Sequence, residues 1–148
     1  MTLEQWLTPT LAATMPRVAR AIPWLLLLGA MEVLGAVVTS FFLMRAAIRI
    51  GAGESSRLSH LWTSNLRDTA RYLARARIAL IIIAAGTVAT WIVLSATRGI
   101  SAETNELLFS LTLGAVLLPT YVTVTVLGRS MSRAADIAGH NVQASSRP

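Results

Sequence analysis

The chain has 148 residues, of which 54% are hydrophobic and 14% charged. Water-soluble domains carry roughly 25% charged residues, so this composition excludes an ordinary soluble domain and indicates a protein that sits in lipid. A chain of this length forms one domain and has no room for a large soluble core beside a membrane region. We therefore expect a single integral membrane domain over residues 1–148.

The charge is strongly basic, with 13 basic residues against 7 acidic ones and a net charge of +6. Nucleic acid is not an expected partner, because the arginines lie between apolar runs and not on a solvent-facing domain. Every basic residue is Arg, which a GC-rich bacterial genome would favour. The absence of Cys excludes disulfides and thiolate metal sites. The two histidines are far apart in sequence, so we expect no metal or other cofactor.

The first segment, residues 1–20, is expected to lie on the outer membrane surface. Thr2 and Gln5 have the spacing of a capping box, and apolar side chains gather on one side of the helix that would follow. Pro9 is expected to interrupt this helix. A secretory signal peptide is the competing interpretation, but the apolar run that follows is longer than such a peptide needs.

The sequence contains three apolar runs that are long enough to span a bilayer. A helix needs about 20 residues, at 1.5 Å of rise each, to cross roughly 30 Å of hydrocarbon. We therefore predict an all-α membrane protein with three transmembrane helices, at residues 21–44, 78–97 and 107–128. Pro119 in the third span removes a backbone hydrogen bond and is expected to kink the helix there. The hydroxyls of Thr120 and Thr123 are candidate donors to the freed carbonyl.

A basic loop, residues 45–77, joins the first two spans, and its residues 56–75 have the periodicity of an amphipathic helix. The apolar face of this helix contains Leu58, Leu61, Trp62, Leu66, Tyr72 and Leu73. The opposite face carries four arginines that we expect to contact anionic lipid headgroups or a cytoplasmic partner: Arg57, Arg67, Arg71 and Arg75. We expect this helix to lie in the membrane interface, separate from the second span.

Orientation follows from the arginines, because short cytoplasmic loops carry an excess of Lys and Arg. The loop at 45–77 is rich in arginine, whereas the loop at 98–106 holds one Arg and two Glu. The protein is therefore expected to have its N-terminus outside, the basic loop inside and the tail, residues 129–148, in the cytoplasm of a bacterial inner membrane. The tail beyond Gly139 is short and polar, so we expect it to be disordered.

Glu32 is the most informative single residue, because an ionised carboxylate inside a span costs a few kcal/mol. On a helical wheel it shares a face with small and polar residues, which favour close contact between helices. The face of the first span consists of Gly29, Glu32, Ala36, Thr39 and Ser40. It is expected to meet Gly86 and Thr90 of the second span, with Gly114 contributing from the third.

Glu32 has two interpretations. A functional one is a site for a proton, a cation or a basic residue of another subunit. A structural one is a protonated carboxyl that donates one hydrogen bond between helices. The structural or subunit-contact role is favoured, because the spans contain no second charge to form a proton relay.

The leading functional hypothesis is a small non-enzymatic subunit of a larger membrane assembly for transport, secretion, conjugation or energy transduction. Its partners would be the lipid bilayer and other membrane subunits. The alternative is a homo-oligomeric pore or proton channel that uses Glu32. Its topology is similar to that of phage holins and of stator proton channels, with which the chain shares no motif. A membrane enzyme acting on lipid or quinone is the third and least favoured possibility, because the sequence brings together no set of acid, base, nucleophile and metal ligands.

Overall fold

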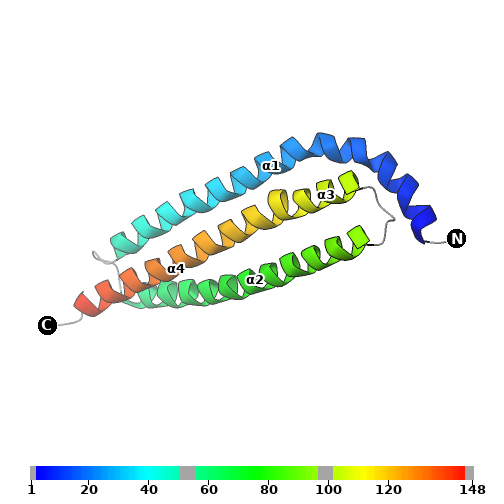
Figure 1. Ribbon diagram of the computed structural model, residues 1–148. Helices are drawn as coiled ribbons and strands as arrows, with labels where there is room; N and C mark the ends of the chain where they lie inside the picture. The colour runs from blue at the N-terminus through cyan, green and yellow to red at the C-terminus, as the bar shows by residue number, and fades with distance from the viewer. Residues whose placement is uncertain (1–2, 51–55, 97–101, 146–148) are drawn as a thin grey trace. The chain divides into compact units, whose positions relative to one another are not determined.

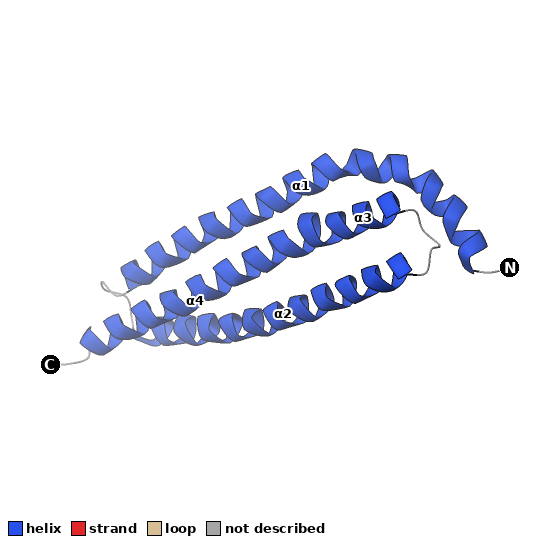
Figure 2. Ribbon diagram, viewed as in Figure 1, coloured by secondary structure: helices blue, strands red, loops and turns tan. Residues whose placement is uncertain are grey.

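A computed structural model describes residues 3–50, 56–96 and 102–145, and every residue in these ranges is helical (Figures 1 and 2). The predicted all-α class is confirmed. Three helices are long and apolar enough to cross a membrane: Arg20–Ile50, Leu61–Ala96 and Glu106–Asn141. They contain the three predicted spans, apart from Thr97, which lies outside the described residues. Three such helices are compatible with a multi-pass membrane protein.

The helices divide into two compact units. The first, which we call the outer unit after the orientation expected from the sequence, comprises Met1–Met31 and Leu80–Thr120. The basic unit comprises Glu32–Ala79 and Tyr121–Pro148. Ten of the 13 arginines belong to the basic unit, which is the origin of its name.

The first helix, α1, runs over Leu3–Ile50 without interruption. The expectation that Pro9 interrupts the first helix is therefore wrong, since α1 continues through this residue into the first span. Pro9, Pro16 and Pro23 recur every seven residues, so they lie on nearly the same side of the helix. The hydrogen bonds that they remove are confined to that side, and a helix can accommodate such losses by bending. The N-terminal stretch of α1, drawn in blue, does bend (Figure 1).

The second helix, α2, runs over Ser56–Ala96 and joins two elements that we predicted to be separate. Residues 56–75 are helical as expected, but no break separates them from the span that begins at 78. The sequence of α2 contains no proline and a single glycine, Gly86, so nothing in it stops the helix at the predicted boundary. A change from polar to apolar composition marks a change of surroundings and not the end of a helix.

The third span consists of three consecutive elements: α3 over Ala102–Ser110, the π-helix η1 over Leu111–Leu117, and α4 over Leu118–Ser145. The π-helix lies directly before Pro119, and the N–H of Leu118 donates to the carbonyl of Leu113. A proline ring clashes with the carbonyl four residues earlier, and the wider π turn separates them. The predicted distortion at Pro119 therefore takes the form of a π-helix.

The helix α4 reaches Ser145, so the expectation of a disordered tail beyond Gly139 is wrong for residues 140–145. The reason is packing in the basic unit. Ala134, Ala135 and Ala138 are completely buried, and their small side chains let α4 lie close to its neighbours. A tail that is packed over these turns continues as a helix.

The core of the basic unit is built from small residues, with Ala47, Ala134 and Ala135 buried beside Leu66. Trp62 of α2 is among the partly buried residues packed against this cluster. Part of the apolar face that we expected to lie in lipid therefore packs on protein. The rest of that face remains outward, because Leu61 and Tyr72 are exposed.

In the outer unit, Trp91 of α2 stacks on Phe109 of α3, with ring centroids 4.7 Å apart and planes inclined at 27°. Offset stacking of this kind is worth about 0.5–1.5 kcal/mol beyond the area that it buries. The contact attaches the end of α2 to the beginning of the third span.

Candidate functional site

The face that contains Glu32 begins at Gly29, and the structure shows why that position is glycine. A Cβ built on Gly29 would lie 2.8 Å from Cγ of Pro119 and 3.3 Å from the carbonyl oxygen of Ala115. The proline ring is rigid and the carbonyl belongs to the backbone, so neither can move aside easily. Gly29 is thus a position where α1 and the third span approach each other closely in the outer unit.

Further along the same face, in the basic unit, Ala36 is buried and Glu32 and Ser40 are half-buried. The Ser40 hydroxyl donates to the Ala36 carbonyl over 2.7 Å, so it satisfies its own helix. Thr39 is exposed. The predicted face is therefore divided, with its small residues turned inward and Thr39 turned outward.

The small residues predicted on the other two spans lie on the surface of the chain. Gly86 and Thr90 of α2 and Gly114 of η1 are all exposed. No atom lies within 4 Å of a Cβ built on Gly86 or on Gly114. The hydroxyl of Thr90 donates to the Gly86 carbonyl over 2.9 Å, which leaves a shallow surface of two small residues one turn apart.

The same spacing occurs on α1, where Gly35 precedes the exposed Thr39 by four residues. Gly35 is exposed, and a Cβ built on it would meet nothing within 4 Å. The pattern of two small residues four positions apart is typical of faces where membrane helices associate. The sequence pattern singled out Thr39 but not its partner Gly35.

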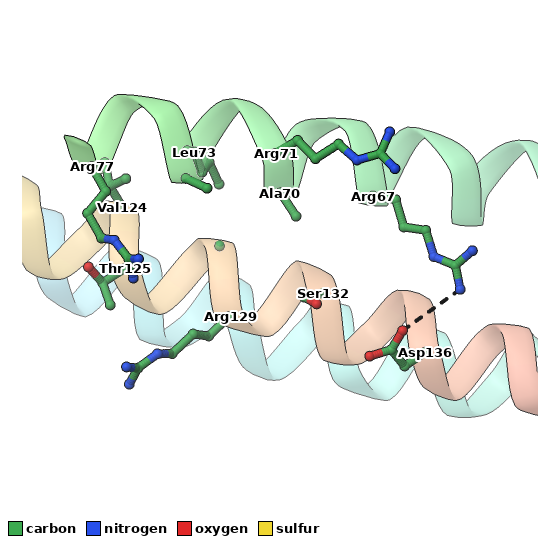
Figure 3. A pocket seen from close by; sticks show the side chains of 12 residues that line it. Arg67, Ala70, Arg71, Leu73, Arg77, Val124, Thr125, Arg129, Ser132 and Asp136 are labelled. Atoms are coloured by element: carbon green, nitrogen blue, oxygen red, sulfur yellow. Dashed lines mark ion pairs between the residues drawn. The ribbon is translucent and has the colours of Figure 1, made fainter. Parts of the chain in front are cut away.

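The predicted arginine face is exposed, and its charges are partly compensated. Arg67 of α2 pairs with Asp136 of α4 across 3.8 Å (Figure 3). Arg71 pairs with Asp68 one turn before it at 3.3 Å, and the Arg75 guanidinium lies 5.9 Å from the centre of the Tyr72 ring. The side chain of Arg57 lies outside the described residues.

Sequence reasoning missed the part that α4 plays in this site. A pocket of about 420 Å³ lies between α2 and α4 of the basic unit, and Arg77, Arg129 and Thr125 are among its lining residues. The signal was the run of small residues around Ala134 and Ala138, which indicates a packed helix and not a tail. Asp136 within that run is the acidic residue that pairs with Arg67.

The threonines near Pro119 behave differently from one another. The Thr120 hydroxyl donates to the carbonyl of Val116 over 2.9 Å. The carbonyl of Ala115, four residues before Pro119, loses its usual backbone donor to the proline. The Thr123 and Thr125 hydroxyl oxygens are buried and have no hydrogen-bond partner among the residues that the structure describes. Buried hydroxyls without partners are rare and call for an explanation.

The chain has no match among known protein families, curated proteins or solved structures. Its function is therefore argued from its own residues. They provide two outward faces of small residues and a pocket between α2 and α4 that is lined in part by arginines.

Proposed function

We propose that this protein is a non-catalytic subunit of a multi-component assembly in a bacterial inner membrane. In such an assembly, neighbouring membrane helices cover the surfaces that this chain leaves open. Assemblies for transport, secretion, conjugation and energy transduction all contain subunits of this kind. The proposal is that the chain is such a subunit, and it does not choose among these four kinds of assembly.

The observation that carries the proposal is the outward position of Gly86 and Thr90 on α2. Helices in lipid gain no hydrophobic free energy from association, so they associate where small residues allow close backbone contact. Within the most apolar 18-residue window of the second span no side chain is buried inside the chain. A second helix placed on Gly86 would make the close contact that the chain itself does not make there.

The proposed orientation rests on the distribution of the arginines. The basic unit contains ten of the 13 arginines, and short segments with excess arginine stay in the cytoplasm. We accordingly place the N-terminus outside and the C-terminus inside. The arginine-bearing turns of α2 then extend from the second span into the layer of anionic headgroups. The exclusive use of Arg over Lys supports a bacterial source.

The test is the mass of the particle that contains this chain when a tagged copy is extracted from its native membrane in mild detergent. We expect a particle with at least one other membrane protein in fixed stoichiometry. The matched variant is Gly86→Leu, which places a large side chain on the contact face, and it should release the partner. The control, Ile81→Phe, adds bulk at another exposed position of the same helix.

Two outcomes contradict the proposal. A monomer of 148 residues without a partner would show that the outward faces contact only lipid. A homo-oligomer that conducts ions when reconstituted alone would favour the pore, in which Glu32 faces the conducting path. Ion conductance lost in Glu32→Gln, with the oligomer intact, would establish that second function.

A further inference from the structure

The pocket in the basic unit lies where two helices leave the apolar part of their spans. Arg77 immediately precedes the apolar run of α2, and Arg129 immediately follows that of the third span. Both arginines line the pocket, together with apolar and small residues such as Leu73 and Gly128. The pocket is thus placed at the level where hydrocarbon gives way to headgroups. Its volume, about 420 Å³, falls within the roughly 300–1,000 Å³ of small-molecule sites.

The charges in the pocket leave two arginines uncompensated. Four arginines and one aspartate line it. Arg67 is paired with Asp136, and Arg71 is paired with Asp68. Arg77 and Arg129 make no ion pair with any residue that the structure describes. Figure 3 shows the Arg77 side chain extending from α2 toward α4, whereas the Arg129 side chain starts on α4 and extends away from α2; both residues line the pocket.

A polar group in the pocket lacks a partner as well. Thr125 lines the pocket, and its hydroxyl oxygen is buried without a hydrogen bond to any described residue. Threonine hydroxyls in helices usually donate to the carbonyl four residues earlier, as Thr120 does in this chain. The Thr125 oxygen is closed to solvent in the observed conformation, so an acceptor atom inside the pocket would satisfy this hydroxyl after a change of the Thr125 rotamer turns it toward the pocket.

From these observations we infer that the pocket binds the phosphate group of an anionic phospholipid. Guanidinium groups match phosphate oxygens with paired hydrogen bonds, and Arg77 and Arg129 supply two such groups. Thr125 donates its hydroxyl to one phosphate oxygen. The acyl chains follow the apolar surface beyond Arg77, where Ile78 and Ile81 are exposed. The position at the border of two spans favours a lipid over a free anion, and basic pockets between spans are known to hold lipid headgroups.

This inference goes beyond the proposed subunit role and its test needs no partner protein. The purified chain is reconstituted in vesicles of equal parts phosphatidylglycerol and phosphatidylcholine and then extracted in mild detergent. Mass spectrometry counts the lipids that remain bound. The double variant Arg77→Gln/Arg129→Gln should retain about tenfold less phosphatidylglycerol, a loss that corresponds to charge-assisted hydrogen bonds removed. Retained phosphatidylcholine should not change.

The matched control is Arg49→Gln/Arg133→Gln, which removes the same charge from two exposed positions of the basic unit outside the pocket. It should retain phosphatidylglycerol as the wild type does. Equal loss in both double variants would overturn the inference, because it would mean that diffuse surface charge holds the lipid. Displacement of the lipid by inorganic phosphate at millimolar concentration would also overturn it, in favour of a free-phosphate site.

A single substitution at Thr125 tests the inference even if the double variant fails to fold. Thr125→Val keeps the shape of the side chain and removes only the hydroxyl, so the helices should assemble as before. We expect it to lower phosphatidylglycerol retention several-fold. Thr125→Ser, which keeps the hydroxyl, should restore it. Unchanged retention in Thr125→Val would show that the hydroxyl does not contact the lipid, and would overturn the assigned geometry.

Discussion

The ring of Pro119 packs directly on Gly29, so that a Cβ added to Gly29 would lie 2.8 Å from Cγ of the proline. This contact joins α1 to the third span in the outer unit, beside the π-helix that precedes the proline. It also explains two sequence features together, because the proline that distorts one helix is accommodated by the glycine of another.

Gly29→Ala is expected to destabilise the protein by about 1–3 kcal/mol, the usual range for overpacking a close contact. Unfolding in mixed detergent micelles, followed by circular dichroism, measures the free energy of unfolding. Gly35→Ala is the matched control, since a Cβ at Gly35 meets nothing within 4 Å. Alanine is a better helix former than glycine by about 1 kcal/mol. Gly35→Ala should therefore change the free energy of unfolding by no more than about 1 kcal/mol, and toward greater stability. Equal effects of the two substitutions would contradict the contact.

Removing the proline ring should relieve the clash that Gly29→Ala creates. The double variant Gly29→Ala/Pro119→Ala is therefore expected to be more stable than the sum of the single effects predicts, by about 0.5–3 kcal/mol. A double-mutant cycle with the same unfolding measurement gives this coupling. Strict additivity would indicate that the two residues do not touch.

The buried alanines of α4 set how closely the helices of the basic unit pack. Ala134→Leu should destabilise the protein by about 1–3 kcal/mol, because the position is completely buried and has no room for three further carbons. The comparison is Ala144→Leu on the same helix, where the side chain is exposed. It should be neutral within about 0.5 kcal/mol. A neutral Ala134→Leu would mean that α4 does not pack over this stretch.

Asp136→Asn removes the ion pair with Arg67, yet only a small loss of stability is expected. Both side chains are more than half exposed, and their closest atoms are 3.8 Å apart. Pairs of this kind contribute about 0–1 kcal/mol, and salt screens them further. Unfolding measured at low and at high salt should show the difference from wild type shrink as salt rises. A loss that does not depend on salt would require another role for Asp136.

Glu32→Gln separates the two interpretations of the half-buried carboxyl. Glutamine keeps the size and one hydrogen-bonding oxygen but cannot ionise. If the residue stabilises helix contact, as we propose, the assembly isolated in mild detergent should keep its composition. Normal assembly combined with lost ion flux would instead assign Glu32 to a conducting path.

The three spans follow from the sequence because apolar runs of about 20 residues are a strong signal. The continuity of α2 across Arg77 was missed, since arginine marks the membrane border without ending a helix. The helical tail was missed as well, because Gly139 suggested a stop whereas Ala134 and Ala138 pack the helix that continues through it.

The pairing of helices was the part that sequence alone did not provide. The face at Gly29 was predicted to be a contact, but its partner is Pro119 and not the stripe at Gly86. A helical wheel indicates which side of a helix is small and polar. It contains no information on which neighbour covers that side, because lipid and protein both accept apolar surfaces.

The most direct test of the subunit proposal uses the absence of cysteine in the natural chain. One variant carries a single cysteine, Gly86→Cys. A separate control variant carries a single cysteine at an exposed position, Ile81→Cys. In native membranes a thiol-reactive photocrosslinker attached at residue 86 should capture a specific membrane protein in high yield, and the same probe at residue 81 should capture lipid. Capture of lipid alone at both positions would contradict a partner on the face that contains Gly86 and Thr90.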